Sequence, residues 1–267
     1  MKIALEAGAH TLELAEELGC AGVPIDGGQL VNDGVDATLA PLRDRGLAVA
    51  QIGCFMFNPL STDTGMQQEQ EQLLTDAIDR AADTGCHTVV IGPGNYDPSH
   101  FGDVDARNFE DDALDLMAAA LKPRLEQAAG VGACLSIEPY LKGCINGPER
   151  FKALHERCGS PDHLRANIDP SSLYDFHDAL FPAAKVAAVC DGFAGHVGVV
   201  HIKEVGLDPG FHLHMGLKPV GQGHTDWGDF IDRITPHTAP DTWCILEHIA
   251  TPEEARATYA ALAPLLM

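Results

Sequence analysis

Four side chains in the C-terminal half have types and spacing that could bind a metal ion. Each closes a short apolar run and is followed directly by loop-like sequence: Glu138 ends ACLSIE, Asp169 ends LRANID, His201 ends HVGVVH and Glu247 ends TWCILE. Three carboxylates and one imidazole suit a borderline or hard divalent ion such as Mn, Mg or Co. If these runs are strands of one sheet, their ends could direct all four side chains to one point.

Taken singly, each of the four residues has an ordinary structural explanation. Glu138 could pair with a neighbouring Lys or Arg, and Asp169 could accept hydrogen bonds within an Asx turn. His201 could be a satisfied core histidine, and Glu247 could be a residue of an exposed rim. The joint pattern favours a metal site, because four metal-compatible residue types recur at four predicted strand ends.

The elements that would position these residues follow from the alternation of apolar runs and helical patterns. We predict strands at 2–6, 21–25, 46–53, 88–92, 133–138, 164–169, 196–201 and 242–247. We predict helices at 10–18, 67–84, 109–129, 148–158, 179–191, 226–234 and 252–265. Pro123 should bend or break its helix, and Asp178, Asp226 and Thr251 are suitable N-caps for the last three.

This alternation defines a fold class. Eight strands that alternate with helices over about 250 residues predict a single (β/α)8 TIM barrel, one domain spanning residues 1–267. An open doubly wound sheet is the alternative, but no GxGxxG motif follows the first predicted strand. The two longest irregular stretches, 93–108 and 204–225, should lie at the C-terminal rim of the barrel, where active-site loops are found.

The chain is strongly acidic, with 39 Asp and Glu against 17 Lys and Arg and a formal net charge of −22. Such a field repels nucleic-acid phosphates and anionic membrane surfaces, so neither is an expected partner. No apolar stretch reaches the roughly 20 residues needed to cross a bilayer. The acidic composition indicates either simple solubility or a surface adapted to high salt, and a protein most stable without KCl would exclude the second.

The cysteines and the N-terminus bear on the compartment. The eight cysteines are scattered without a CxxC pair, so we interpret them as small core residues in a reducing compartment rather than as a disulfide framework. The N-terminal sequence MKIALEAGAH lacks the long apolar core of a signal peptide. The predicted location is therefore the cytoplasm.

Short motifs around the four residues carry a family resemblance. SIEP, NIDPSSL, VVHIKE, VGQGHTDWGDF and ILEH occur in that order, and together they resemble the xylose-isomerase-like TIM barrels. That group holds sugar isomerases, ketose 3-epimerases, inosose dehydratases and endonuclease IV. The resemblance implies that Glu138, Asp169, His201 and Glu247 bind one divalent metal, Mn, Mg or Co, with Zn a further option. It also implies a small-molecule sugar substrate and allows a homo-oligomer.

A metal at such a site would favour proton transfer next to a carbonyl. Chelated by adjacent oxygens of an α-hydroxy ketone, it acts as a Lewis acid and acidifies the neighbouring C–H, so that an enediolate can form. Glu138 and Glu247 could then remove and return a proton on opposite faces. The outcomes are epimerisation, aldose–ketose isomerisation or, by loss of a β-hydroxyl, dehydration. We predict an isomerase or epimerase, with a lyase or dehydratase second and a non-catalytic sugar-binding barrel as a different class.

Lys203 is a further catalytic candidate. By strand alternation it shares the inward face with His201, so its ammonium should point at the metal site. There it could hydrogen-bond a substrate hydroxyl or oxyanion. The alternative is a salt bridge with one of the ligating carboxylates.

Four residues are candidates for substrate contact: Lys142, Ser172, His212 and His214. Many relatives carry a His three residues after the Asp, and Ser172 in that place weakens a direct transfer of ketose-epimerase contacts. His212 and His214 alternate, so both could line the pocket or hold a second metal; the alternative is a pair of exposed loop histidines.

Two further classes are disfavoured. An endonuclease IV-like nuclease would need more His ligands, which the second and third inner loops, GCFMFNP and IGPGNYDP, lack. A phosphorylated substrate would call for an Arg or Lys cluster or a glycine-rich loop that opens a helix. The sequence therefore favours one metal and an unphosphorylated polyol or keto sugar.

Overall fold

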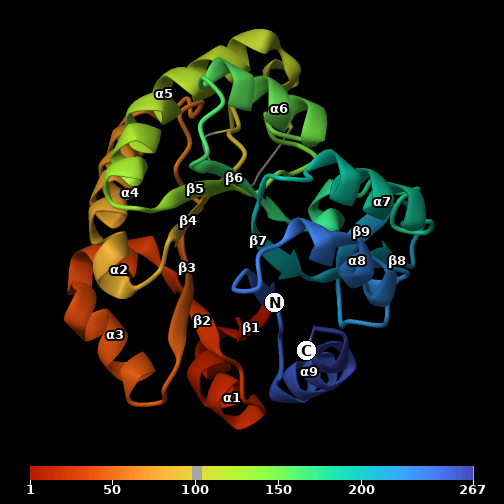
Figure 1. Cartoon of the computed structure of the whole chain (residues 1–267). Coiled ribbons are helices and arrows are strands. Elements are labelled where there is room, and N and C mark those ends of the chain that lie inside the picture. The colour runs from red at the N-terminus through yellow and green to blue at the C-terminus, as the bar shows by residue number, and fades with distance from the viewer. Residues whose placement is uncertain (98–103, 267) are drawn as a thin grey trace. The chain divides into compact units, whose positions relative to one another are not determined.

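The computed structural model describes residues 1–97 and 104–266, so part of the predicted loop 93–108 lies outside the described residues. Eight parallel strands form a closed barrel in the order β1-β10-β7-β6-β5-β4-β3-β2, as the sequence predicted (Figure 1). Their bounds are β1 Lys2–Leu5, β2 Gly22–Asp26, β3 Ala48–Cys54, β4 Thr88–Ile91, β5 Cys134–Ile137, β6 Leu164–Ile168, β7 Val197–Ile202 and β10 Trp243–Leu246. The runs are almost wholly apolar because a parallel strand is covered on both faces.

The chain divides into two compact units, and the first holds Met1–Pro24, Pro41–Ala50 and Ile168–Met267. In it β1 pairs with β10 and β10 pairs with β7, both in parallel. The register sets Ile245 opposite His201 and Leu246 opposite Ile202. The C-terminal ends of β7 and β10 are therefore level, and the residues that follow them can meet.

The second unit holds Ile25–Ala40 and Gln51–Asn167, with β3, β4, β5 and most of β6 as parallel neighbours. Ile91 lies opposite Ile137, the last residues of β4 and β5. The amide of Glu138 donates to the Ile91 carbonyl at 2.9 Å, which extends the ladder by one residue. Glu138 therefore leaves the sheet at a fixed strand end, as Glu247 does in the first unit.

All the predicted helices are present: α1 Thr11–Leu18, α4 Thr64–Thr84, α5 Asp111–Gly130, α6 Pro148–Arg157, α7 Ala183–Gly192, α8 Trp227–Ile234 and α9 Pro252–Leu266. Pro123 does not break α5. Asp226 caps α8 by accepting from the Asp229 amide, and Thr251 accepts from the Glu254 amide. The Asp178 prediction was wrong, because α7 begins at Ala183 and the Asp178 carboxylate instead pairs with Lys185.

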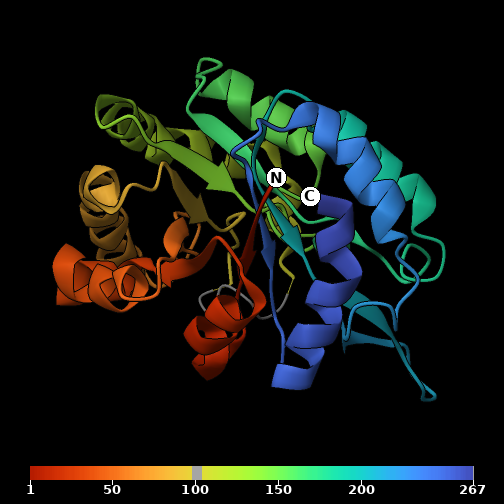
Figure 2. The same cartoon turned by 60° about the horizontal axis from the view of Figure 1, so that its bottom comes forward.

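Two regions differ from the predicted pattern. Helices α2 Gly27–Asp33 and α3 Val35–Arg43 occupy a segment for which no helix was predicted, since glycines and Pro41 interrupt its helical spacing. The stretch 204–225, predicted to be irregular, contains an antiparallel hairpin of β8 Glu204–Asp208 and β9 His214–Lys218 (Figure 2). Its strands are short and interrupted by glycine, which weakens a strand pattern.

The cysteines behave as core residues. All eight are free thiols and six of them are buried. Burial raises the pKa of the Cys244 thiol to about 12, so this thiol stays protonated and unreactive. Among the described residues, no helix is long and apolar enough to cross a membrane.

Candidate metal and substrate site

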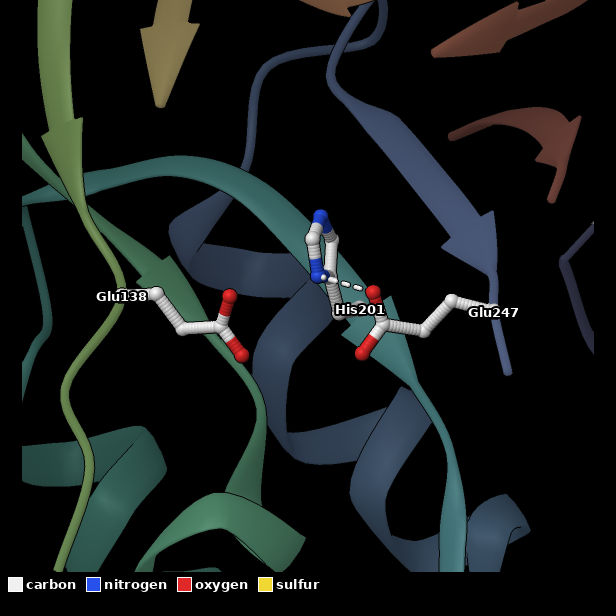
Figure 3. A group of neighbouring side chains, drawn as sticks. All are labelled: Glu138, His201 and Glu247. Carbon is white, nitrogen blue, oxygen red and sulfur yellow. Dashed lines mark ion pairs between the residues drawn. The ribbon is translucent and has the colours of Figure 1, made fainter. Parts of the chain in front are cut away.

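The first unit brings His201 and Glu247 together at the level ends of β7 and β10. The Glu247 amide donates to the Ile202 carbonyl at 3.1 Å, which holds Glu247 in the sheet. His201 is fully buried, and its Nδ1 lies 2.8 Å from Glu247 Oε2 (Figure 3). A carboxylate removed from water needs a hydrogen-bonding or charged partner, and here the imidazole of His201 is that partner.

Lys203 joins the same cluster. Its Nζ lies 2.7 Å from Asp169 Oδ2 and 3.0 Å from Glu247 Oε1. The side chains of Lys203, Asp169 and Glu247 are 11%, 0% and 10% exposed, so these contacts are shielded from solvent. Lys203 therefore forms a salt bridge, which was the alternative to a substrate contact in the sequence analysis. It pairs with two predicted metal ligands, Asp169 and Glu247.

The ionisation of Glu247 follows from these neighbours. Burial acts to raise the pKa of the Glu247 carboxyl, but the charges of His201 and Lys203 and the hydrogen bond from His201 outweigh burial. The pKa is held well below its usual range. Glu247 is therefore a carboxylate at neutral pH, the form that can bind a cation or accept a proton.

Asp169 is fixed from its other side by a helical turn. It follows β6 and caps the 3-10 helix Pro170–Leu173, where its Oδ1 accepts from the Ser171 amide at 2.8 Å and the Ser171 hydroxyl at 2.7 Å. The Ser172 hydroxyl donates to Asp169 Oδ2 at 3.4 Å. The local cap and the contact with Lys203 coexist, because Oδ1 accepts from Ser171 whereas Oδ2 accepts from Ser172 and Lys203.

Glu138 belongs to the second unit, directly after β5. Glu138 offers a carboxylate oxygen as a metal ligand, and in the first unit His201 and Glu247 offer an imidazole nitrogen and a carboxylate oxygen (Figure 3). The donor set fits a hard or borderline cation, since it consists of carboxylate oxygens and an imidazole. The Lys203 ammonium, bonded to both Asp169 and Glu247, shows that these two carboxylates already accept a cation.

Of the four predicted substrate contacts, Ser172 joins this cluster through its hydroxyl bond to Asp169 Oδ2. In the second unit, Lys142 Nζ lies 5.9 Å from the centre of the Tyr140 ring. On the hairpin, His214 is 74% exposed and its Nδ1 lies 2.5 Å from Asp208 Oδ2. His212 is exposed and stands edge-on to Phe211 at 5.0 Å. The contacts of the two histidines are thus made within the hairpin, which begins directly after Lys203.

Buried amides in the second unit hold the segment that carries Lys142. Asn108 is fully buried, and its Nδ2 donates to the Asn95 side chain at 2.8 Å and to the Lys142 carbonyl at 2.9 Å. Its Oδ1 accepts from the Tyr96 amide at 2.9 Å. Sequence reasoning missed this residue, because an Asn within a polar stretch resembles any loop residue.

A buried carboxylate after Lys203 was also missed. Glu204 is 1% exposed, and its Oε2 accepts from the Trp227 indole at 2.9 Å and from the Gly221 amide at 3.4 Å. A Cβ on Gly223 would lie 2.3 Å from Glu204 Oε1, so the segment 219–226 packs directly on this carboxylate. Glu204 belongs to the motif VVHIKE and Trp227 to the motif VGQGHTDWGDF, so this hydrogen bond joins the two motifs.

The closed parallel barrel with acidic and imidazole side chains at its strand ends defines a TIM barrel with a candidate metal centre. The sequence profile of the xylose isomerase-like TIM barrel family matches residues 2–265, and the chain belongs to that family. No curated protein sequence matches it.

Solved structures with the same fold include enzymes. A xylose isomerase-like TIM barrel protein from Mycobacterium smegmatis in complex with magnesium is 18% identical, with a TM-score of 0.77 over 99% of this chain and 96% of that one. The 3-keto-D-glucoside 4-epimerase of E. coli, in its apo form, is 18% identical, with a TM-score of 0.73 over 99% and 98%. A probable 3-DHS dehydratase from Bacillus anthracis is 14% identical, with a TM-score of 0.69 over 98% and 99%. At these identities the likeness shows the fold.

Proposed function

We propose that this protein is a divalent-metal-dependent isomerase or epimerase that acts on a keto sugar or polyol ketone through an enediolate. The observation that carries the proposal is the buried, ionised Glu247, held between His201 and Lys203. A carboxylate kept charged in a shielded site can bind a metal or remove a proton. Membership of the family and the fold shared with a sugar epimerase support the same class.

The metal would be held by Glu138, Asp169, His201 and Glu247. Mn, Mg or Co best suit these donors, Zn is a further option, and the magnesium complex of a fold relative supports the class of ion. When bound, the metal supplies Lewis acidity that makes the C–H next to the substrate carbonyl easier to deprotonate. A single ion is proposed, since the second and third inner loops, GCFMFNP and IGPGNYDP, lack the His ligands that further ions would need.

The protein's own residues would move the proton. Glu247 accepts it on one face of the substrate, and Glu138 returns it on the other. Lys203 donates a hydrogen bond to the oxygen on which negative charge develops, and His201 orients Glu247 through its 2.8 Å contact. Lys142, Ser172, His212 and His214 are the proposed contacts to substrate hydroxyls.

A metal-dependent dehydratase is the second candidate. The fold shared with a probable 3-DHS dehydratase favours it, because the same proton removal followed by loss of a β-hydroxyl gives dehydration. In either case the partner is a small sugar, and the net charge of −22 supports neither nucleic acid nor an anionic membrane as a partner. A cytoplasmic location, a homo-oligomer and a surface adapted to high salt stay predictions.

The test is NMR of ketoses incubated with the protein and Mn in deuterated water. Deuterium at a carbon next to the carbonyl, in the starting sugar or in an epimer, supports proton transfer, and loss of water identifies the dehydratase. Glu247→Gln should abolish the exchange and weaken Mn binding, whereas Glu17→Gln, in an exposed pair with Arg256, should change neither. A protein that binds sugar equally well with and without metal, and exchanges no deuterium, would instead be a binding module.

A further inference from the structure

His248, directly after Glu247, has an unusual backbone conformation. Its φ is 57°, and among the described residues the only other non-glycine residue with positive φ is Ser160, at 56°. A left-handed residue with a side chain costs roughly 1–2 kcal/mol relative to a right-handed one. Such strain persists where the surrounding structure imposes it, and it is concentrated at functional sites.

A carboxylate at the end of β1 imposes this turn. The His248 amide donates to Glu6 Oε2 at 2.9 Å, and Glu6 Oε1 accepts from the Gly8 amide at 3.2 Å. The Glu6 amide in turn donates to the Leu246 carbonyl at 2.8 Å. Ile249 is buried, so the chain reaches the surface at His248 and turns inward again at the next residue. The turn therefore presents the His248 side chain outward from a fixed point.

The imidazole of His248 lies close to Glu247 but is not hydrogen-bonded to it. His248 Nε2 lies 3.7 Å from Glu247 Oε1, which is too long for a hydrogen bond. His201 pairs with Glu247 Oε2 and Lys203 pairs with Oε1, so both carboxylate oxygens have a partner other than His248. The His248 side chain is 51% exposed, and its ring can exchange hydrogen bonds with a molecule from solution.

We propose that His248 is a substrate-contacting residue, which hydrogen-bonds a hydroxyl of the keto sugar beside the carbon that Glu247 deprotonates, and that Glu6 is its positioning residue. This inference rests on the proposed function and adds a specificity-determining contact to it. A side chain fixed by a strained turn loses little freedom when it binds, which is why such a turn is useful in recognition. An imidazole can donate to or accept from a hydroxyl, so it suits a polyol.

Substitution of His248 distinguishes the effect of its side chain on binding from the effect of the turn on stability. His248→Gly removes the imidazole and suits the left-handed backbone, so the melting temperature should stay equal or rise. Mn affinity should stay within about twofold, whereas KM for the exchanging ketose should rise about tenfold, the loss of one hydrogen bond. His248→Asn, which tolerates positive φ and keeps an amide, should restore most of the affinity. Ser160→Gly relieves the same strain elsewhere and should leave KM unchanged.

A binding measurement keeps the inference separate from the proposed function. With 15N-labelled histidine and Mg, the His248 ring signals, assigned by their loss in His248→Gly, should shift saturably on addition of a ketose. If the wild type exchanges deuterium and His248→Gly has the wild-type KM, the inference is overturned while the function stands. If no ketose exchanges, the proposed function fails. In that case a saturable shift still supports a sugar contact at His248, and signals unmoved by every ketose overturn it.

Discussion

Lys203 should be essential for the stability of the metal-free protein, and Lys203→Met tests this. The ammonium is the shared partner of two buried carboxylates, at 2.7 Å from Asp169 and 3.0 Å from Glu247. At an effective dielectric constant of 20, each of these attractions is worth about 6 kcal/mol before desolvation is subtracted. Methionine fills a similar volume but removes the ammonium from Asp169 and leaves Glu247 with its contact to His201.

The expected loss follows from the burial of the three groups. Removing one partner of a buried ion pair costs about 3–5 kcal/mol, because the remaining charge stays buried and unpaired. For a chain of this size, 1 kcal/mol shifts the melting temperature by roughly 2–4 °C, so Lys203→Met should melt about 6–20 °C lower in EDTA. A divalent ion bound to the folded state replaces the missing charge, so Mn should narrow this difference.

Lys185→Met is the matched control. Lys185 Nζ lies 3.0 Å from Asp178 Oδ2, the same distance, but the lysine side chain is 31% exposed. Such a pair is worth at most about 1 kcal/mol. Urea denaturation and thermal melting of both variants, with EDTA and with Mn, give the comparison. If Lys203→Met is within 1 kcal/mol of the wild type in EDTA, the buried cluster does not depend on its cation and the reasoning is refuted.

Three further predictions concern the same framework. Asn108→Ala should cost about 3 kcal/mol in urea denaturation, since a buried side chain loses three hydrogen bonds; a loss below 1 kcal/mol would contradict this. Gly223→Ala should destabilise by about 1–3 kcal/mol, because its Cβ would meet Glu204 at 2.3 Å, whereas Gly130→Ala, with no atom within 4 Å, should not. The pKa of Glu247 is lower in the folded state than in the unfolded state, where it is about 4.3, so this carboxylate stabilises the fold above that pH. This stability is lost as the pH falls through the lower pKa of the folded state. In EDTA the wild type should therefore lose more stability than Glu247→Gln between about pH 6 and 3.

The strand ends could be predicted from the sequence because each parallel strand is an apolar run that stops at a polar residue. This placed Glu138, Asp169, His201 and Glu247 at the ends of their strands, and alternation indicated the face of Lys203. The sequence could not supply distances, so the choice between a substrate contact and a salt bridge for Lys203 needed the structure.

Other features depend on partners that are remote in the chain. The left-handed turn at His248 is imposed by Glu6, 242 residues away, and nothing in the local sequence ILEHIA indicates it. The helices α2 and α3 were missed for a local reason, since glycines and Pro41 mask their spacing. The burial of Glu204 in VVHIKE likewise depends on a partner elsewhere in the chain, the indole of Trp227.

The pairing of β1 with β10 has a consequence for how the protein is made. Ala4 pairs with Gly22 across 18 residues but with Ile245 across 241, and closing the longer loop costs about 2 kcal/mol more in chain entropy. Glu247 and His248 follow this late strand, and Glu6 belongs to the first. During synthesis β1 can therefore meet β2 long before it can meet β10. The end of the first unit that carries Glu247 and His248 is therefore assembled only after β10 has left the ribosome.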